Sequence, residues 1–265
     1  MSGDVNPTLP TSLQVQVLDG VAVLRLSRAA KRNALDDTMV RGLEDFFSAP
    51  PAAVRAIVLD AEGEHFCAGV DLAALGQLST FAGLEHSLMW HRAFERIESG
   101  RLPVVSVLKG AVIGGGLELA CATHLRVAEP SAFYSLPEGQ LGLFVGGGAA
   151  VRVPRLIGLS RMVDLMLTGR VYRAEEGQQV GLSHYLVDAG QGLSFALGLA
   201  RTMARNAPLT NFAVLQALPR IAAANPSEGY LLESLMAAVA SSSDEAQTRM
   251  RAFLDGRAGA GRGRR

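Results

Sequence analysis

Two glutamates stand in turns that are marked by glycine or proline, and their side chains can exchange protons. Glu118 closely follows the glycine run 114–116, and Glu138 lies between Pro137 and Gly139. Carboxyl groups act as general acids and bases, and glycine-rich turns offer backbone N–H groups that stabilise a negative oxygen. Together with the upstream segment 66–72, they predict a site that polarises a carbonyl oxygen and handles a water or a substrate proton beside it.

The composition excludes several classes of protein. The chain has 265 residues, 49% of them hydrophobic, which predicts one large domain with room for a smaller appendage. Lysine plus arginine and aspartate plus glutamate each number 25, so the charge balance does not indicate nucleic acid or an anionic membrane as a partner. Cys67 and Cys121 lie in apolar runs without metal-ligand spacing, which favours reduced core thiols over a disulfide or a metal site.

The sequence carries no sign of export or membrane insertion. The first eleven residues are polar and contain prolines, without the basic start and apolar run of a signal peptide. No uncharged apolar stretch reaches the length of about 18 residues expected of a membrane span. We therefore expect a cytoplasmic protein.

The elements that must position the two glutamates alternate along the first part of the chain. A hairpin with an Asp19-Gly20 turn is expected first, from the alternation of apolar and polar residues. The expected strands cover residues 13–18, 21–26, 54–59, 104–108, 125–128 and 132–134. The expected helices cover residues 34–48, 81–98, 118–122, 149–157, 160–167, 174–180, 192–206, 210–224, 228–240 and 244–254. Strands that alternate with helices predict an α/β fold with parallel pairing.

Three regions are expected along the chain. Residues 1–190 are mixed α/β and form the core domain with the active site, and residues 191–256 form a helical C-terminal region. Residues 257–265 are rich in glycine and arginine, which predicts a flexible basic tail.

Five motifs follow one another along the chain: RAAKRNAL (28–35), HFCAGVDL (65–72), GGGLELA (114–120), LPE (136–138) and VPRLIG (153–158). By these motifs and their order, the chain resembles the crotonase superfamily of enoyl-CoA hydratases and isomerases over nearly its whole length. The resemblance implies a spiral of ββα units followed by a helical trimerisation region. It also implies a homotrimer or a dimer of trimers, and an acyl-CoA substrate. Coenzyme A then belongs to the substrate, and no separate cofactor or metal is expected.

By this resemblance, the backbone N–H groups of Ala68 and Gly115 form an oxyanion hole for the thioester oxygen. The glycines would alternatively serve only a tight turn and close helix packing. Glu138 corresponds to the main acid/base and Glu118 to the partner that orients the water. The alternative is that Glu118 is a surface charge on a helix and Glu138 an ordinary turn residue.

The resemblance also assigns the substrate-binding residues. Lys31, Arg32 and the backbone at Ala34 would receive the coenzyme A moiety, or else form a solvated turn. The segment from Phe66 through Ala68, Gly69, Val70 and Asp71 to Leu72 would bind through its main chain, with the Asp71 side chain capping the next helix. Phe144 would line the acyl pocket. Trp90 would either border that pocket or belong to the core.

The presence of both glutamates favours an enoyl-CoA hydratase, a hydro-lyase that adds water across the 2,3 double bond. The first alternative is an enoyl-CoA isomerase, or another acyl-CoA lyase or hydrolase of this superfamily, because moving a double bond needs one base only. A second alternative is a non-catalytic scaffold that binds coenzyme A. A dinucleotide-binding protein is disfavoured, because no GxGxxG run follows the first strand.

Overall fold

The N-terminal hairpin forms as expected. The structure, a computed structural model, describes residues 9–76 and 78–262, so the first eight residues and the last three lie outside it. Strands β1 (Leu13–Leu18) and β2 (Val21–Leu26) pair antiparallel across Asp19 and Gly20. Both turn residues have positive φ, 50° and 77°, which matches the right-handed twist of the strands that a tight hairpin joins.

The main sheet has six strands in the order β1-β2-β3-β4-β6-β9. Strands β3 (Ala56–Ala61), β4 (Val104–Leu108), β6 (Leu125–Ala128) and β9 (Tyr185–Leu186) continue from β2 in parallel, which confirms the expected parallel pairing. Strand β3 begins two residues later than its apolar run predicted.

A second, three-stranded sheet makes the chain a spiral. Its strands β5 (Ala111–Ile113), β7 (Phe133–Ser135) and β8 (Tyr172–Arg173) lie in that order. Strand β4 in the main sheet is followed by β5 in the second sheet and then by helix α4 (Gly115–Ala122). The next turn repeats this with β6 and β7, so the predicted ββα spiral is confirmed.

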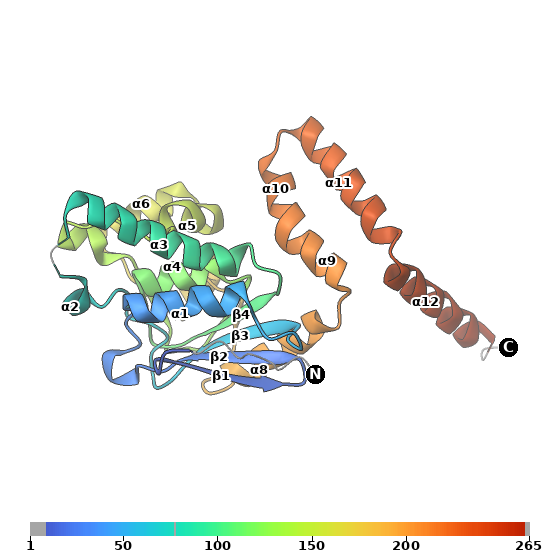
Figure 1. The fold of residues 1–265 in the computed structure, drawn as a ribbon, viewed down its shortest axis with the longest axis horizontal. Coiled ribbons are helices and arrows are strands. Elements are labelled where there is room, and N and C mark those ends of the chain that lie inside the picture. Colours follow the sequence, from blue (N-terminus) through green and yellow to red (C-terminus); the bar gives the residue numbers. More distant parts are fainter. Residues whose placement is uncertain (1–8, 77, 263–265) are drawn as a thin grey trace. The chain divides into compact units, whose positions relative to one another are not determined.

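Helices cover the sheets and enclose the core. The first of them, α1 (Asp37–Ser48), lies beside α3 (Thr80–Glu98) over the sheet (Figure 1). Helix α1 begins three residues later than predicted, because the Asp36 carboxylate accepts the Met39 N–H and so fixes the helix start. The other short helices of this part of the chain are η1 (Ala29–Lys31), α2 (Leu72–Leu75), η2 (Pro137–Leu141), α5 (Ala149–Ile157), α6 (Leu159–Thr168) and α7 (Ala174–Val180).

Helix α8 (Gly192–Ala204) belongs to the core domain, not to the C-terminal region. Its Ala196 and Ala200 are buried against valines of β3, β4 and β6. The first compact unit therefore ends at Ala204 rather than at residue 190. The physical reason is that the second face of a buried parallel sheet also has to be covered.

The second unit starts at Arg205, and its described part contains helices joined by short turns and no strand. It contains α9 (Pro208–Phe212), the π-helical η3 (Ala213–Ala217), α10 (Leu218–Ala223), α11 (Pro226–Ser241) and α12 (Asp244–Arg262). Helix α12 continues to Arg262, so it includes the first part of the tail predicted from residue 257, whose flexibility stays a prediction. Residues 263–265 lie outside the described part.

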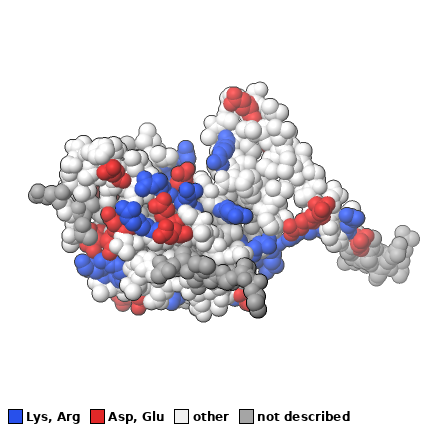
Figure 2. Space-filling model, viewed as in Figure 1, with Lys and Arg blue, Asp and Glu red and all other residues white. Residues whose placement is uncertain are grey.

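Charges of both signs lie side by side on the face of the molecule drawn in Figure 2. This mixture agrees with the equal numbers of acidic and basic residues. None of the described helices combines the length and the apolar character that a bilayer crossing requires. The described residues also contain no cluster of three or more histidine, cysteine, aspartate or glutamate side chains arranged around a common metal position.

Candidate active site

Glu118 is buried, and one of its oxygens is held by backbone N–H groups. It lies in the first turn of α4 and is only 3% exposed. Its Oε1 accepts hydrogen bonds from the N–H groups of Gly147 (2.8 Å) and Ala149 (3.0 Å). Burial raises the pKa of the Glu118 carboxyl, while the two N–H donors and the charge of Arg152 act in the opposite direction. One oxygen is thus fixed, and the other is left to face a ligand.

Glu138 has a different environment. It belongs to the short 3-10 helix η2, which begins at Pro137. Its Oε2 is buried without a hydrogen-bond partner among the described residues. Burial, with a further contribution from the Glu118 charge, raises the pKa of Glu138 to about 7. A carboxyl group with that pKa is present in both protonation states near neutrality.

Both glutamates line one pocket of about 370 Å³, so the structure brings together the two side chains that the sequence singled out. The rest of the wall is mostly apolar and also includes backbone at glycine positions. Besides the glutamates it consists of Val70, Leu78, Gly83, His86, Ser87, Trp90, Gly115, Leu143, Phe144, Val145, Gly146 and Gly147. Phe144, predicted to line the acyl pocket, is at this wall and is 72% exposed.

The predicted pair of free amides needs a correction. The Ala68 N–H donates to the Arg32 carbonyl at 3.0 Å, so it is not available to a ligand in this structure. The reason is the left-handed turn at Arg32 and Asn33, with φ of 51° and 55°, which brings that carbonyl against residue 68. Ala68 is also absent from the pocket wall, whereas Val70 belongs to it.

The amide beside Gly115 is that of Val70. A Cβ placed on Gly115 would lie 3.5 Å from the Val70 nitrogen, and a Cβ on Gly69 would lie 3.4 Å from the Gly115 nitrogen. Neither the Val70 nor the Gly115 N–H has a hydrogen bond to another described residue. Two neighbouring, unpaired N–H groups at the wall of a pocket can receive a negative oxygen, and the start of helix α4 favours that charge.

The glycine run allows this close approach. A Cβ on Gly115 would come within 2.6 Å of the Trp90 ring, and one on Gly116 would overlap the Cys67 carbonyl. Gly114 has a φ of 51°, and a Cβ there would lie 2.6 Å from Glu138 Oε1. Tight packing, which the sequence left as an alternative to function, is therefore the feature that brings the free amides and the two carboxyl groups together.

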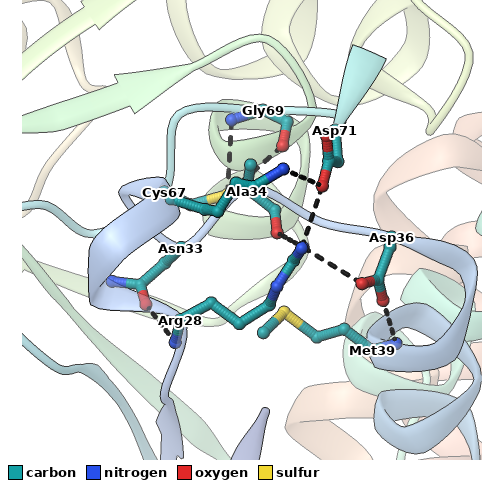
Figure 3. Close-up of polar contacts among 9 residues, drawn as sticks. Arg28, Asn33, Ala34, Asp36, Met39, Cys67, Gly69 and Asp71 are labelled. Atoms are coloured by element: carbon teal, nitrogen blue, oxygen red, sulfur yellow. Dashed lines mark hydrogen bonds and ion pairs between the residues drawn. The ribbon is translucent and has the colours of Figure 1, made fainter. Parts of the chain in front are cut away.

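Arg28, Lys31 and Asp71 form an ion-pair cluster at the end of the segment 66–72. Figure 3 shows the contacts of Arg28 with Asp71 and with Ala34. Arg28 donates to Asp71 Oδ2 (2.9 Å) and to the Ala34 carbonyl (2.6 Å). Lys31 Nζ lies 3.4 Å from the same Asp71 oxygen and is 55% exposed. The hydrogen bond from Arg28 lowers the pKa of Asp71. The expectation that Asp71 caps the next helix is wrong, because its carboxylate is engaged by these cations instead.

The remaining predicted residues differ in their exposure to solvent. The Phe66 side chain is fully buried in the core, so its side chain cannot contact a ligand. Arg32 and Leu72 are exposed. Cys67 and Cys121 are buried free thiols, as expected.

Sequence reasoning missed His86, Ser87 and Arg152. His86 lines the pocket, with Nε2 3.0 Å from Asp37 Oδ1 and 3.2 Å from Trp90 Nε1. Ser87 donates to the Gly146 carbonyl at 2.7 Å. The available signal was helical spacing, because residues 83, 86, 87 and 90 share one face of α3. That face resolves the alternatives for Trp90: it is a buried core residue that also borders the pocket.

Comparisons with known proteins agree with this architecture. The profile of the family described as enoyl-CoA hydratase/isomerase matches residues 16–260. The enoyl-CoA hydratase EchA19 of Mycobacterium tuberculosis is 31% identical over 89% of this chain and 91% of its own. The short-chain-enoyl-CoA hydratase of Clostridium acetobutylicum is 27% identical over 89% of this chain and 92% of its own.

Solved structures give the same result. A crystal structure from Rhodopseudomonas palustris, of a protein provisionally named as an enoyl-CoA hydratase, has a TM-score of 0.93 and 55% identity, covering 95% of this chain and 97% of that one. The enoyl-CoA hydratase of Bacillus anthracis has a TM-score of 0.87 and 26% identity, covering 92% and 96%. The spiral of ββα units, the glycine-flanked glutamates and these matches lead to one conclusion: the chain belongs to the enoyl-CoA hydratase/isomerase family.

Proposed function

We propose that this protein is an enoyl-CoA hydratase that adds water across the 2,3 double bond of an acyl-CoA thioester. The observation that carries the proposal is the shared pocket of Glu118 and Glu138, with the unpaired amides of Val70 and Gly115 in its wall. The hydratase names of relatives that match along most of the chain support it.

The two amides would bind the thioester oxygen. When water adds to the β-carbon, electrons move toward that oxygen, and the intermediate resembles an enolate. N–H groups that are already in place need no reorganisation, and removing one such donor typically costs about a hundred- to a thousandfold in rate. Val70 therefore replaces Ala68 as the proposed partner of Gly115.

The two glutamates would divide the proton transfers between them. Glu118 Oε1 is held by two N–H donors, which favours its ionised form and leaves Oε2 to accept a hydrogen of the water. Glu138 Oε2 has no donor facing it, which favours its protonated form. In hydration, the water oxygen bonds to the β-carbon, Glu118 takes a water proton, and Glu138 gives its proton to the α-carbon. Exchange with solvent restores both groups.

The other predicted contacts remain part of the proposal. Lys31 and Arg32 would contact phosphates of coenzyme A, which enters as part of the substrate, so no separate cofactor is required. Leu143, Phe144 and Val145 would contact the acyl group. The free thiols of Cys67 and Cys121 support a cytoplasmic location. The equal numbers of basic and acidic residues support the proposal that neither nucleic acid nor a membrane is a partner.

We propose a homotrimer or a dimer of trimers, assembled through the helical C-terminal unit. Helix α11 of that unit exposes Tyr230, Leu231, Leu235 and Val239. Exposed apolar side chains on one helix are typical of a surface that a partner covers.

The second candidate function is double-bond isomerisation, which the family description includes. Isomerisation needs one group that moves a proton between carbons, and Glu138 alone could do this. The fixed position of Glu118 favours hydration, because a second carboxylate is needed to hold a water molecule.

The test is a set of 2-enoyl-CoA substrates with short, long, branched and aromatic acyl groups. A hydratase removes the absorbance of the conjugated enoyl thioester and yields a product heavier by one water. Incubation with 3-enoyl-CoA tests the isomerase, which instead creates that absorbance without a change in mass. Binding of acyl-CoA without turnover of either substrate would leave only the non-catalytic scaffold and would exclude the proposal.

A further inference from the structure

Arg152 is a buried arginine close to the pocket, and the proton transfers proposed above do not use it. It lies in α5 and is only 9% exposed. Its Nε is 2.7 Å from Glu98 Oε2 at the end of α3, and its Nη1 donates to the Gly147 carbonyl at 2.9 Å. A buried guanidinium is unfavourable unless it is paired and hydrogen-bonded, so these two contacts define where it can lie.

Gly147 connects Arg152 to Glu118. Its carbonyl accepts from Arg152, and its N–H donates to Glu118 Oε1 at 2.8 Å. The next residue, Gly148, has a φ of 107°, and a Cβ there would overlap Arg152 Nη1. The loop therefore bends closely around the guanidinium, and the position of the Gly147 N–H depends on it.

The charge of Arg152 acts on Glu118 as well. The titratable groups around Glu118 are Arg152 on α5, His91 on α3, Glu138 on η2 and Cys121 on its own helix α4, with Glu98 paired to Arg152. Burial is the dominant influence and raises the pKa of Glu118, while Arg152 and His91 lower it. Without Arg152, the carboxyl would keep its proton to a higher pH.

We propose that Arg152 is a positioning residue, which holds the 146–148 loop through the Gly147 carbonyl and so keeps Glu118 oriented for the water. The inference rests on the proposed hydration reaction. Arg152 does not line the pocket itself. Its effect reaches the reacting atoms through Gly147 and Glu118.

The experiment compares wild type with R152M, R152K and R155M. Methionine removes the charge and the contacts with Glu98 and the Gly147 carbonyl. Lysine keeps the charge but lacks the planar guanidinium group. Arg155 lies on the same helix and is exposed, so R155M is the matched control. The measurements are kcat and KM for hydration between pH 5 and pH 9, together with thermal unfolding.

We expect R152M to lower kcat about ten- to a hundredfold with KM changed less than about threefold, as for a misplaced catalytic group. The pH below which activity falls should move upward in R152M and much less in R152K. R155M should behave as wild type. A R152M enzyme with lower thermal stability but wild-type kcat and pH profile would overturn the proposal, because the ion pair would then be structural only.

A second measurement separates this inference from the proposed function. Carbon-13 NMR of glutamate-labelled protein, with E118Q to identify the signal, reports the Glu118 pKa without any substrate. If wild type hydrates no enoyl-CoA but the Glu118 pKa rises in R152M, the proposed function fails and the link from Arg152 to Glu118 stands. An unchanged pKa in R152M removes the link. If R152M does not fold, R152K is used instead, because lysine keeps the charge but not the planar group that contacts Glu98 and the Gly147 carbonyl together. A wild-type kcat and a wild-type carbon-13 signal of Glu118 in R152K would overturn the proposal.

Discussion

The surroundings of the two glutamates differ although both face one pocket. Glu118 is held by the backbone N–H groups of Gly147, in the loop before α5, and of Ala149, the first residue of α5, with Arg152 nearby. Glu138 sits on a short 3-10 helix, and its Oε2 has no partner among the described residues. Burial raises the pKa in both cases; two N–H donors and Arg152 oppose this at Glu118, whereas at Glu138 only its own backbone N–H does.

This difference assigns different tasks to identical side chains. Two carboxyl groups that share a pocket do not both ionise easily, so the pair tends to hold one proton. We propose that Glu138 holds the shared proton, because its Oε2 faces no donor, whereas two N–H donors and Arg152 act against the effect of burial at Glu118. A fixed acceptor and a proton donor are the two groups that addition of water requires.

The largest expected effect tests that division. E138Q should lower hydration a hundredfold or more, the order expected for general acid–base catalysis, and should lower isomerisation of a 3-enoyl-CoA as well. E118A should impair hydration but leave isomerisation within about tenfold of wild type, since one carboxyl suffices for that reaction. Both rates are measured on the same preparations by absorbance. Equal losses of both activities in the two variants would show that the glutamates act as one unit.

A smaller effect is expected from the glycines that pack against each carboxyl group. In G114A the new Cβ would lie 2.6 Å from Glu138 Oε1, and in G147A it would lie 2.8 Å from Glu118 Oε2. Each variant should lose about ten- to a hundredfold in kcat, because a small displacement of a catalytic group has effects of this size. G147A should spare isomerisation, whereas G114A should not.

The control for the glycine variants is G198A. Gly198 lies on α8, and a Cβ there would have open space within 4 Å. Its kcat should equal that of wild type. If G114A and G147A also keep wild-type rates, the carboxyl groups are not held as tightly as their packing indicates.

The smallest expected effect concerns stability. The folded-state pKa of Glu138, about 7, lies above the ordinary glutamate pKa of 4.5, so the folded protein binds more protons than the unfolded chain between these pH values. Stability that depends on this proton is present below about pH 4.5 and is lost as pH rises through 7. E138Q should therefore be more stable than wild type above pH 7, by on the order of 1–2 kcal/mol after discounting for partial exposure.

Urea unfolding at several pH values measures this difference. The advantage of E138Q over wild type should be largest near pH 8 and should shrink toward zero near pH 4.5. A difference that does not vary with pH would mean that the Glu138 carboxyl is not destabilised by its surroundings. The comparison between the two glutamates would then lose its electrostatic basis.

Local sequence determined most of the elements. Strand β4 and helices α5 and α7 have the predicted ends, because apolar spacing and glycine or proline boundaries are local signals. Helix α1 was predicted three residues early, since its start depends on which acidic side chain caps it. Helix α8 was assigned to the wrong unit, since sequence periodicity does not say which sheet face a helix covers.

The chain order of the motifs also predicted that Glu118, Glu138 and Gly115 would meet, and they line one pocket. The three-dimensional fold decided which amide is free. The sequence does not show whether the N–H of Ala68 or that of Val70 is free. In the folded chain, the Arg32 carbonyl in the left-handed turn accepts the Ala68 N–H, whereas the Val70 N–H remains unpaired beside Gly115. The support of Arg152 for Glu118 likewise arises only on folding, because it runs through a loop 29 residues further along the chain. Residue types and local spacing are properties of the sequence, whereas the pairing of donors and acceptors across distant segments depends on packing.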